Sequence, residues 1–160
     1  MDVNGFKGPN SEARNGKQYD IRSFKVARFS TGCAGNDISG IGCVYELPSY
    51  SPIKGGSEEM KKWDPSWAES SIDSQYDNYW AGAKKACDDI GMSLPDLGTL
   101  KKLYKKGKED SSLGLPTSGS FWSSLEYGAY GAYFVNFGNG RTDGGNAKGY
   151  SYDRVLCVGD

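Results

Sequence analysis

Four cysteines, at positions 33, 43, 87 and 157, are the residues whose type and spacing point most clearly to chemistry. Their number is even and no C-x-x-C pair occurs, which argues against a zinc ribbon or a thioredoxin-like redox motif and favours disulfides. Three pairings are open; proximity in the sequence favours Cys33 with Cys43, which leaves Cys87 with Cys157. The alternative is four buried free thiols in a cytosolic protein.

The chain contains no histidine, which removes Ser-His-Asp triads, Cys-His dyads and histidine-ligated zinc or haem iron. No paired carboxylates and no nucleophile with an adjacent base stand out, so we expect a protein that is not an enzyme and needs no cofactor. One further set of ligands is Asp2 and Asn4, whose side-chain oxygens at alternate positions suit calcium. The alternative for this D-x-N-G run is a tight turn.

The charge balance limits the partners. Nineteen basic and twenty acidic residues give a net charge of −1, so we expect no nucleic-acid partner and no membrane contact by this chain. No run reaches the ~18 apolar residues of a membrane span, and no signal peptide opens the chain. Because disulfides require an oxidising compartment, we expect an exported protein, extracellular or on the cell surface, that is present here without its leader.

The elements that must position these residues follow from length and pattern. A chain of 160 residues is long enough for one domain, and its 23 glycines and 11 tyrosines favour turns and strands over a helical bundle. Residues 1–20 predict an irregular arm and residues 21–160 a single domain. Alternation predicts strands over 21–31 and around Val44, joined as a hairpin that a Cys33–Cys43 bridge would close.

The remaining elements predict an α+β fold. Residues 48–75 read as a connection with one helical turn near 58–63. An apolar helix face with Cys87 on it predicts a helix within 76–92 that stops at Gly91, and Asp96 is positioned to cap a second helix over 96–109. Three short strands are predicted over 120–127, 132–137 and 152–158.

Several residues of the second half carry a family resemblance. They are Ala86, Cys87, Gly91, Leu94, Pro95, Leu100, Tyr104, Trp122, Ser123, Ser124, Glu126, Ala132, Val135, Phe137, Gly140, Val155 and Cys157. In this order they resemble the C-type-lectin-like domains found at the C-terminus of bacterial collagen-like proteins. The resemblance implies two helices packed on short antiparallel strands and a disulfide from the first helix to the last strand, which agrees with Cys87–Cys157. The acidic calcium cage of sugar-binding animal lectins is not visible.

The opening DVNGFKGPN resembles a stretch of type IV pilins and pseudopilins. This resemblance implies a hydrophobic helix upstream, absent from this chain, that would anchor or polymerise the native protein.

Residues 127–153 are rich in Tyr, Asn, Gly, Asp and Ser, the residue types that dominate adaptable binding surfaces. Alternation places Val135 and Phe137 inward and Phe134 and Asn136 outward. We expect one contiguous aromatic and polar ligand-binding surface, made by Tyr130, Tyr133, Phe134, Asn136, Asn139, Arg141, Asp143, Asn146, Tyr150, Tyr152 and Asp153.

The same segment resembles the variable region of proteins diversified by retroelements, in which adenine-specific mutagenesis alters selected codons. An AAC codon changed at its adenines never yields Lys, Glu, Gln, Met or Trp, and within residues 127–153 these five types occur only at Lys148. Strands and turns avoid such residues in any case, which is the alternative explanation. Under diversification, Trp122, Glu126 and Lys148 would be fixed framework positions.

Together these patterns predict a non-enzymatic, surface-displayed ligand-binding domain, of receptor or adhesin type, that recognises a protein or a glycan through residues 127–153. The alternative is a structural or minor type IV pilin subunit whose tyrosine-rich segment contacts other subunits.

Overall fold

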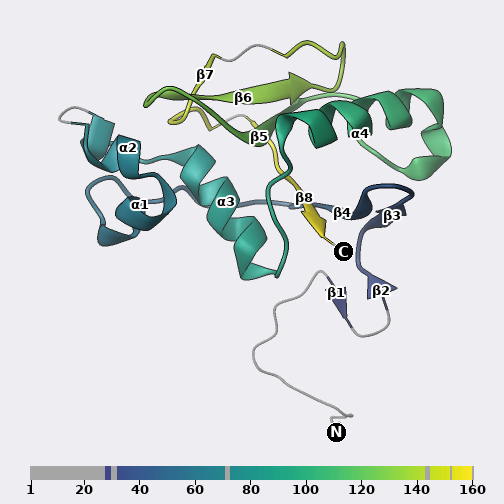
Figure 1. Ribbon diagram of the computed structural model, residues 1–160, viewed down its shortest axis with the longest axis horizontal. Coiled ribbons are helices and arrows are strands. Elements are labelled where there is room, and N and C mark those ends of the chain that lie inside the picture. Colours follow the sequence, from purple (N-terminus) through teal and green to yellow (C-terminus); the bar gives the residue numbers. More distant parts are fainter. Residues whose placement is uncertain (1–27, 30–31, 71–72, 143–144, 152, 160) are drawn as a thin grey trace, which may run out of the picture.

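The computed structural model describes residues 28–29, 32–70, 73–142, 145–151 and 153–159. The arm predicted over 1–20, the calcium candidates Asp2 and Asn4, and most of the strand predicted over 21–31 lie outside these residues. The described chain has the predicted α+β character. Helices α1, α2 and α3 gather at one end and α4 lies at the other (Figure 1).

The N-terminal strands form two small antiparallel pairings. Strand β1 (Arg28–Phe29) pairs with β2 (Gly32–Cys33), and β3 (Asn36–Ile38) pairs with β4 (Gly42–Glu46). The predicted hairpin partner of the strand around Val44 was therefore wrong, because that partner is β3 and not residues 21–31. The chain reverses inside the predicted loop, where Gly40 has a φ of 82° and Ile41 N–H donates to the Ile38 carbonyl at 3.0 Å.

The segment predicted as a connection over 48–75 is more helical than expected. Helix α1 (Glu58–Trp63) is the predicted turn, and it is followed by α2 (Pro65–Ala68) and the short 3-10 helix η1 (Asp73–Gln75). Helix α2 begins at Pro65 because Asp64 caps it, accepting the Trp67 N–H at 3.3 Å.

Both long helices form where the sequence predicts them. Helix α3 (Tyr79–Asp89) ends before Gly91, which has a φ of 75°, and is capped by the Asn78 side chain. Helix α4 (Leu97–Glu109) begins after Asp96, which accepts the Thr99 N–H at 2.7 Å as the predicted cap. A 3-10 turn, η2 (Ser111–Leu113), follows α4.

The C-terminal half adds a third sheet. Strands β5 (Ser120–Tyr127), β6 (Gly131–Asn136) and β7 (Asn146–Ala147) pair antiparallel in that order. Strands β5 and β6 confirm two predicted strands, whereas β7 was not predicted. Strand β8 (Leu156–Gly159) begins later than the strand predicted over 152–158. It pairs with β4, so one sheet contains β3, β4 and the last strand of the chain.

Two apolar clusters share strand β5. Trp122 packs with the Cys87–Cys157 bridge and α3, while the adjacent Phe121 packs with Leu100, with Val135 of β6 and with Phe137. Neighbouring residues on a strand point to opposite faces, so β5 contributes one large side chain to each cluster.

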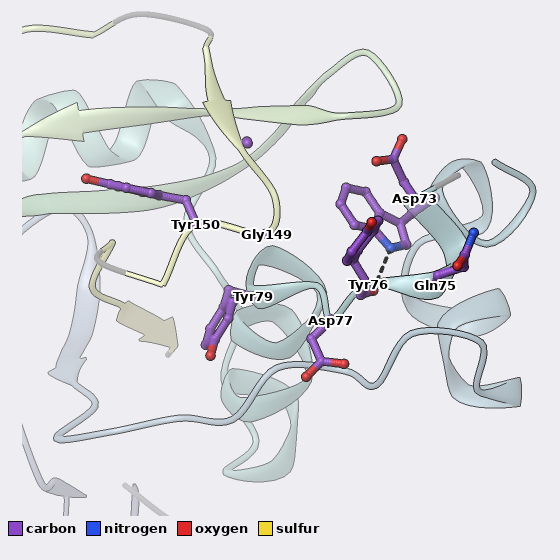
Figure 2. A pocket seen from close by; sticks show the side chains of 9 residues that line it. Asp73, Gln75, Tyr76, Asp77, Tyr79, Gly149 and Tyr150 are labelled. Atoms are coloured by element: carbon purple, nitrogen blue, oxygen red, sulfur yellow. Dashed lines mark hydrogen bonds between the residues drawn. The ribbon is translucent and has the colours of Figure 1, made fainter. Parts of the chain in front are cut away.

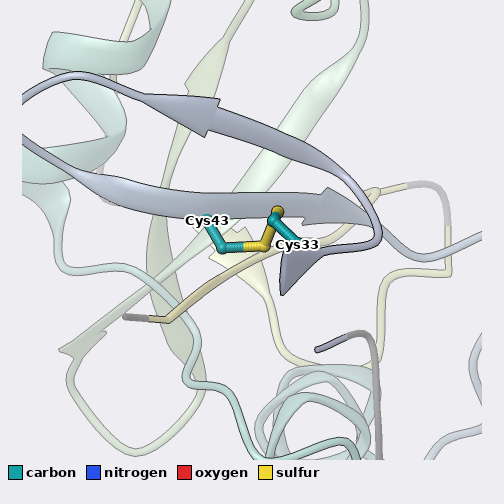
Figure 3. Close-up of a disulfide and its surroundings, with 2 residues drawn as sticks. All are labelled: Cys33 and Cys43. Atoms are coloured by element: carbon teal, nitrogen blue, oxygen red, sulfur yellow. A yellow bond between two sulfur atoms is a disulfide. The ribbon is translucent and has the colours of Figure 1, made fainter. Parts of the chain in front are cut away.

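Both predicted disulfides are present, Cys33–Cys43 (Figure 3) and Cys87–Cys157, and the described residues contain no free cysteine. The second bridge joins α3 to β8. Among the helices described here, none is long and apolar enough to cross a membrane.

Candidate ligand-binding site

Exposed aromatic side chains gather at the end of the molecule where β5 turns into β6. The large apolar side chains that are exposed among the described residues are Tyr76, Leu125, Tyr127, Tyr130 and Tyr150. Tyr130, at the turn, is 62% exposed, and Tyr76, just before α3, is 59% exposed. Glu126 accepts a hydrogen bond from Ser66 of α2 at 2.6 Å, which holds the helical segment against this end of the sheet. We call this region the tyrosine-rich end.

An open cleft of about 700 Å³ lies within the tyrosine-rich end. Its walls come from Trp67 of α2, from η1 and the residues after it, and from β7 and the segment that follows it. Figure 2 shows Tyr150 and Tyr79 toward one side and Tyr76 and Asp73 toward the other. The lining residues are Trp67, Asp73, Gln75, Tyr76, Asp77, Tyr79, Ala147, Gly149 and Tyr150.

Hydrogen bonds hold the polar wall of this cleft in place. Trp67 Nε1–H donates to the Tyr76 carbonyl at 3.1 Å, Asp77 accepts the Gly55 N–H at 3.1 Å, and Asp73 accepts the Ser70 hydroxyl at 3.1 Å. The charged residues that line the cleft are Asp73 and Asp77, both acidic. The cleft therefore offers aromatic faces beside hydrogen-bond acceptors.

Lys148 supports the cleft from inside the protein. Its Nζ lies 2.9 Å from Asp64 Oδ2 and 2.5 Å from Glu126 Oε2, and 4.7 Å from the centre of the Trp80 ring. Its carbonyl accepts the Tyr79 N–H at 2.7 Å, at the start of α3. Burial raises the pKa of Glu126, but hydrogen bonds from Lys148 and Ser66 outweigh it and lower that pKa overall.

A second buried polar group lies next to the cleft. Trp122 Nε1–H donates to the Tyr50 hydroxyl at 3.0 Å, and this hydroxyl donates to the Asp153 carbonyl at 2.7 Å. Burial raises the pKa of Tyr50 to about 12. Burial also raises the pKa of Asp153 to about 6, although Asn146 donates to its Oδ2 at 2.6 Å; Oδ1 has no hydrogen-bond partner.

The family model described as "Domain of unknown function (DUF8780)" matches residues 59–159, which is more than half of the chain. The chain belongs to this family. No curated protein matches the sequence. The matched range includes every residue that lines the cleft, together with Asp64, Glu126 and Lys148. The Cys33–Cys43 bridge lies outside it.

In this DUF8780 domain the predicted surface residues divide into separate groups. Tyr130 and Tyr150 belong to the tyrosine-rich end, whereas Asn136, Asn139 and Arg141 lie at the opposite end of β6. The half-buried Tyr133 and Phe134 of β6 lie between the two groups, and one contiguous surface stays a prediction. Asp143 and Tyr152 lie outside the described residues.

The side chains between these ends are less exposed than predicted. Val135 and Phe137 point inward as expected, but Tyr133 and Phe134 are half-buried, and Tyr133 packs edge-on against Tyr127 with ring centres 5.3 Å apart. Asn146 is half-buried by its hydrogen bond to Asp153. Asp153 is only 2% exposed, so its predicted place on the surface was wrong; the backbone carries its side chain inward to Asn146.

Sequence reasoning missed most of the cleft in the DUF8780 domain, because only Tyr150 of its lining residues was a predicted site residue. Asp73, Gln75 and Asp77 were assigned to a connection and a helix start, and Tyr76 was treated as part of a helix that in fact begins at Tyr79. The sequence signal here was Tyr76 in a polar run, with Asp73 three residues before it and Asp77 directly after it.

Among the residues that the structure describes, one group of metal-binding residue types occurs; it lies outside the cleft and consists of Cys33, Asp37 and Cys43. The two sulfurs are joined to each other, so they do not offer the thiolates that a soft metal ion requires.

Proposed function

We propose that this protein is a non-catalytic ligand-binding domain of receptor or adhesin type, and that it recognises a protein or a glycan through the tyrosine-rich end. The observation that carries the proposal is that the exposed large apolar side chains of the described residues gather there, beside an open cleft. Large exposed apolar patches on a folded protein commonly mark interaction sites. Tyrosine supplies contact area at little cost in conformational entropy.

The proposed scaffold is a C-type-lectin-like fold displayed outside the cell. Two helices packed against short antiparallel strands, with a disulfide from α3 to the last strand, support that scaffold. Two disulfides fit an extracellular protein. Such a frame lets surface side chains change at little cost in stability, because the frame does not depend on them.

Diversification by a retroelement is the finer part of the proposal. Burial of Trp122 and Lys148 fits their assignment to a fixed framework, and exposure of Tyr127, Tyr130 and Tyr150 fits a surface free to vary. Sequencing downstream of the gene tests this. A reverse-transcriptase gene and a near-copy of codons 122–158 that differs at adenines would support it, and their absence would leave an undiversified binding domain.

Binding itself is tested with a printed glycan array and, in parallel, a phage-displayed random-peptide library. The full chain should select a glycan or a peptide, and the Tyr76→Ser, Tyr150→Ser double variant should lose at least about tenfold in affinity, as expected for aromatic hot spots. A matched control is Lys102→Ala, Lys105→Ala on the exposed side of α4, which should bind as the parent does.

Two results would contradict this function. One is the absence of selected binders in both screens, and the other is equal affinity in the parent and the double variant. Concentration-dependent self-association that the double variant loses would favour the alternative, a pilin-type subunit that uses the tyrosine-rich end as a subunit contact.

A further inference from the structure

Lys148, Asp64 and Glu126 form a buried triad beneath the tyrosine-rich end. The Lys148 side chain is 0% exposed and that of Asp64 is 1% exposed, with Nζ and Oδ2 2.9 Å apart. Glu126 reaches the same nitrogen at 2.5 Å from a position that is 40% exposed. Lysine is rarely buried so completely, and burial of an ion pair costs both partners their hydration.

The two Asp64 oxygens have different surroundings. Oδ1 accepts hydrogen bonds from the Trp67 N–H at 3.3 Å and the Ser66 hydroxyl at 3.0 Å. Oδ2 faces Lys148 Nζ and accepts the Asn78 side-chain amide at 2.8 Å. Negative charge on Oδ1 is therefore stabilised by the fixed Trp67 N–H and by the Ser66 hydroxyl, whose single hydrogen is shared with Glu126 Oε2 at 2.6 Å, while Oδ2 lies on the side of the amine.

Glu126 contacts Lys148 directly and is linked to Asp64 through Ser66. Its Oε2 lies 2.5 Å from Lys148 Nζ and 2.6 Å from the Ser66 hydroxyl, which lies 3.0 Å from Asp64 Oδ1. A carboxyl group in this position can take a proton from one partner and pass it to the other. The Trp80 ring, 4.7 Å from Nζ, covers the amine on another side.

We propose that Lys148 and Asp64 condense into an intramolecular amide bond, with Glu126 carrying the protons. This inference does not rest on the proposed function. It would add a third covalent cross-link, between α1–α2 and the segment after β7, to the two disulfides.

The step balances without an oxidant or any other reactant. Glu126 moves one proton from the Lys148 ammonium to Asp64 Oδ2, which makes the amine and the acid neutral. The amine attacks Asp64 Cγ, a C–N bond forms, and the negative charge develops on Oδ1. Glu126 takes a second proton from the nitrogen and gives it to Oδ2 as the Cγ–Oδ2 bond breaks. One ammonium and one carboxylate become one amide and one water.

Two physical effects favour this condensation inside the protein. Holding the reactants together gives an effective molarity of about 10⁵–10⁸ M in well-oriented cases. Formation of the amide also removes the charges of Lys148 and Asp64, and with them the desolvation free energy that a buried ion pair costs. Trp67 N–H and the Ser66 hydroxyl keep their acceptor, because Oδ1 becomes the amide oxygen. The partly exposed Glu126 borders solvent and gives the released water a way out.

The intact mass of the full chain, measured after reduction of both disulfides, tests the proposal. We expect a mass lower than that of the linear sequence by one water molecule. A succinimide at Asp143–Gly144 would also lose a water, so a proteolytic digest must show one branched peptide that joins the segments around Asp64 and Lys148. An unshifted intact mass, or a loss of water confined to residues 143–144, would overturn the proposal.

Matched variants identify the proton carrier. Glu126→Gln keeps both reacting groups and should restore the unlinked mass, whereas Glu59→Gln, at an exposed glutamate of α1, should leave the cross-link in place. A branched peptide that persists in Glu126→Gln would contradict the role given to Glu126. If Glu126→Gln does not fold, the digest of the parent chain still decides whether the bond exists.

Discussion

At the scale of single residues, burial separates residues that hold the frame from residues that can contact a ligand. Lys148 lies within residues 127–153 yet has no exposed surface. Its Nζ pairs with Asp64, and its carbonyl oxygen accepts the Tyr79 N–H, so both groups bind the helical half of the molecule. Tyr150, two residues later, is exposed in the cleft. A substitution at Lys148 would therefore disturb the frame, and one at Tyr150 the binding surface.

Asp153 gives a prediction about pH. Its folded-state pKa of about 6 lies above the ordinary value of 3.8, because burial disfavours the charged carboxylate. The folded protein therefore binds the proton more tightly, and the stability gained from protonation is lost as pH rises from about 4 through 6. Asp153→Asn should raise the free energy of unfolding at pH 7.5 by up to about 2 kcal/mol and leave it almost unchanged at pH 4.

Urea denaturation of parent and variant at the two pH values measures this difference. Asp37→Asn, at an exposed aspartate of β3, is the control and should show no such pH dependence. Equal loss of stability in Asp153→Asn at both pH values would show that the charge is not the destabilising feature.

At the scale of elements, close approach of the backbone decides what α3 tolerates. Gly82 lies inside α3, where a Cβ would meet the Ser51 carbonyl oxygen at 2.1 Å. The only contact for a Cβ at Gly98, exposed in the first turn of α4, would be Asp96 Oδ1 at an ordinary 3.6 Å. A side chain is therefore sterically excluded at Gly82 but has room at Gly98.

Alanine at these two positions should have opposite effects. Gly98→Ala should stabilise the protein by about 0.5–1 kcal/mol, the usual gain in helix propensity. Gly82→Ala should destabilise it by about 1–3 kcal/mol, since the segment around Ser51 must move away. Thermal unfolding of both variants checks the contrast, and stabilisation by Gly82→Ala would contradict the close packing of residues 51–52 on α3.

The elements that the sequence predicted well are those with local signals. Helix α4 carries its cap at Asp96 and α3 its stop at Gly91, so both could be located without tertiary information. Strand β7 could not, because two residues have no periodicity and pair only through Gly131 and Ala132 of β6. Strand β3 was assigned to a loop for the same reason, since its pairing depends on the turn at Gly40.

The candidate site was only partly predictable for a related reason. Tyr130 and Tyr150 were found from composition, because residues 127–153 are rich in the Tyr, Asn, Gly and Ser that dominate adaptable binding surfaces. Tyr76 and Asp73 come from a region more than fifty residues earlier in the chain than Tyr130. Long-range contacts, among them the Lys148–Asp64 pair and the hydrogen bond from the Tyr79 N–H to the Lys148 carbonyl, bring that region to the cleft. Single-sequence patterns do not encode such distant contacts.

At the scale of the whole molecule, the two disulfides restrain very different lengths of chain. Both bridges contact the same apolar cluster, but Cys87–Cys157 spans 70 residues and Cys33–Cys43 spans 10. Loop-closure entropy gives a stabilisation of about 4 kcal/mol for the long loop and about 3 kcal/mol for the short one.

Removal of the two bridges should therefore lower the free energy of unfolding by different amounts. Cys87→Ala, Cys157→Ala should lower the free energy of unfolding by about 4 kcal/mol or more, since both sulfurs are buried, and Cys33→Ala, Cys43→Ala by about 2–3 kcal/mol. Chemical denaturation of the two double variants measures the order. A larger loss of stability on removal of Cys33–Cys43 would contradict the claim that the α3–β8 bridge contributes more to the free energy of unfolding.

The central claim is that ligands bind at the tyrosine-rich end, and mapping a bound ligand by two-dimensional NMR tests it most directly. The full chain, labelled with ¹⁵N, is titrated with the oligosaccharide or peptide that gives the strongest signal in the array or library. The account predicts that amide shifts concentrate at residues 73–79 and 145–151, which line the cleft, and around the β5–β6 turn. Shifts that concentrate on α4 or on β3 and β4 instead would contradict it.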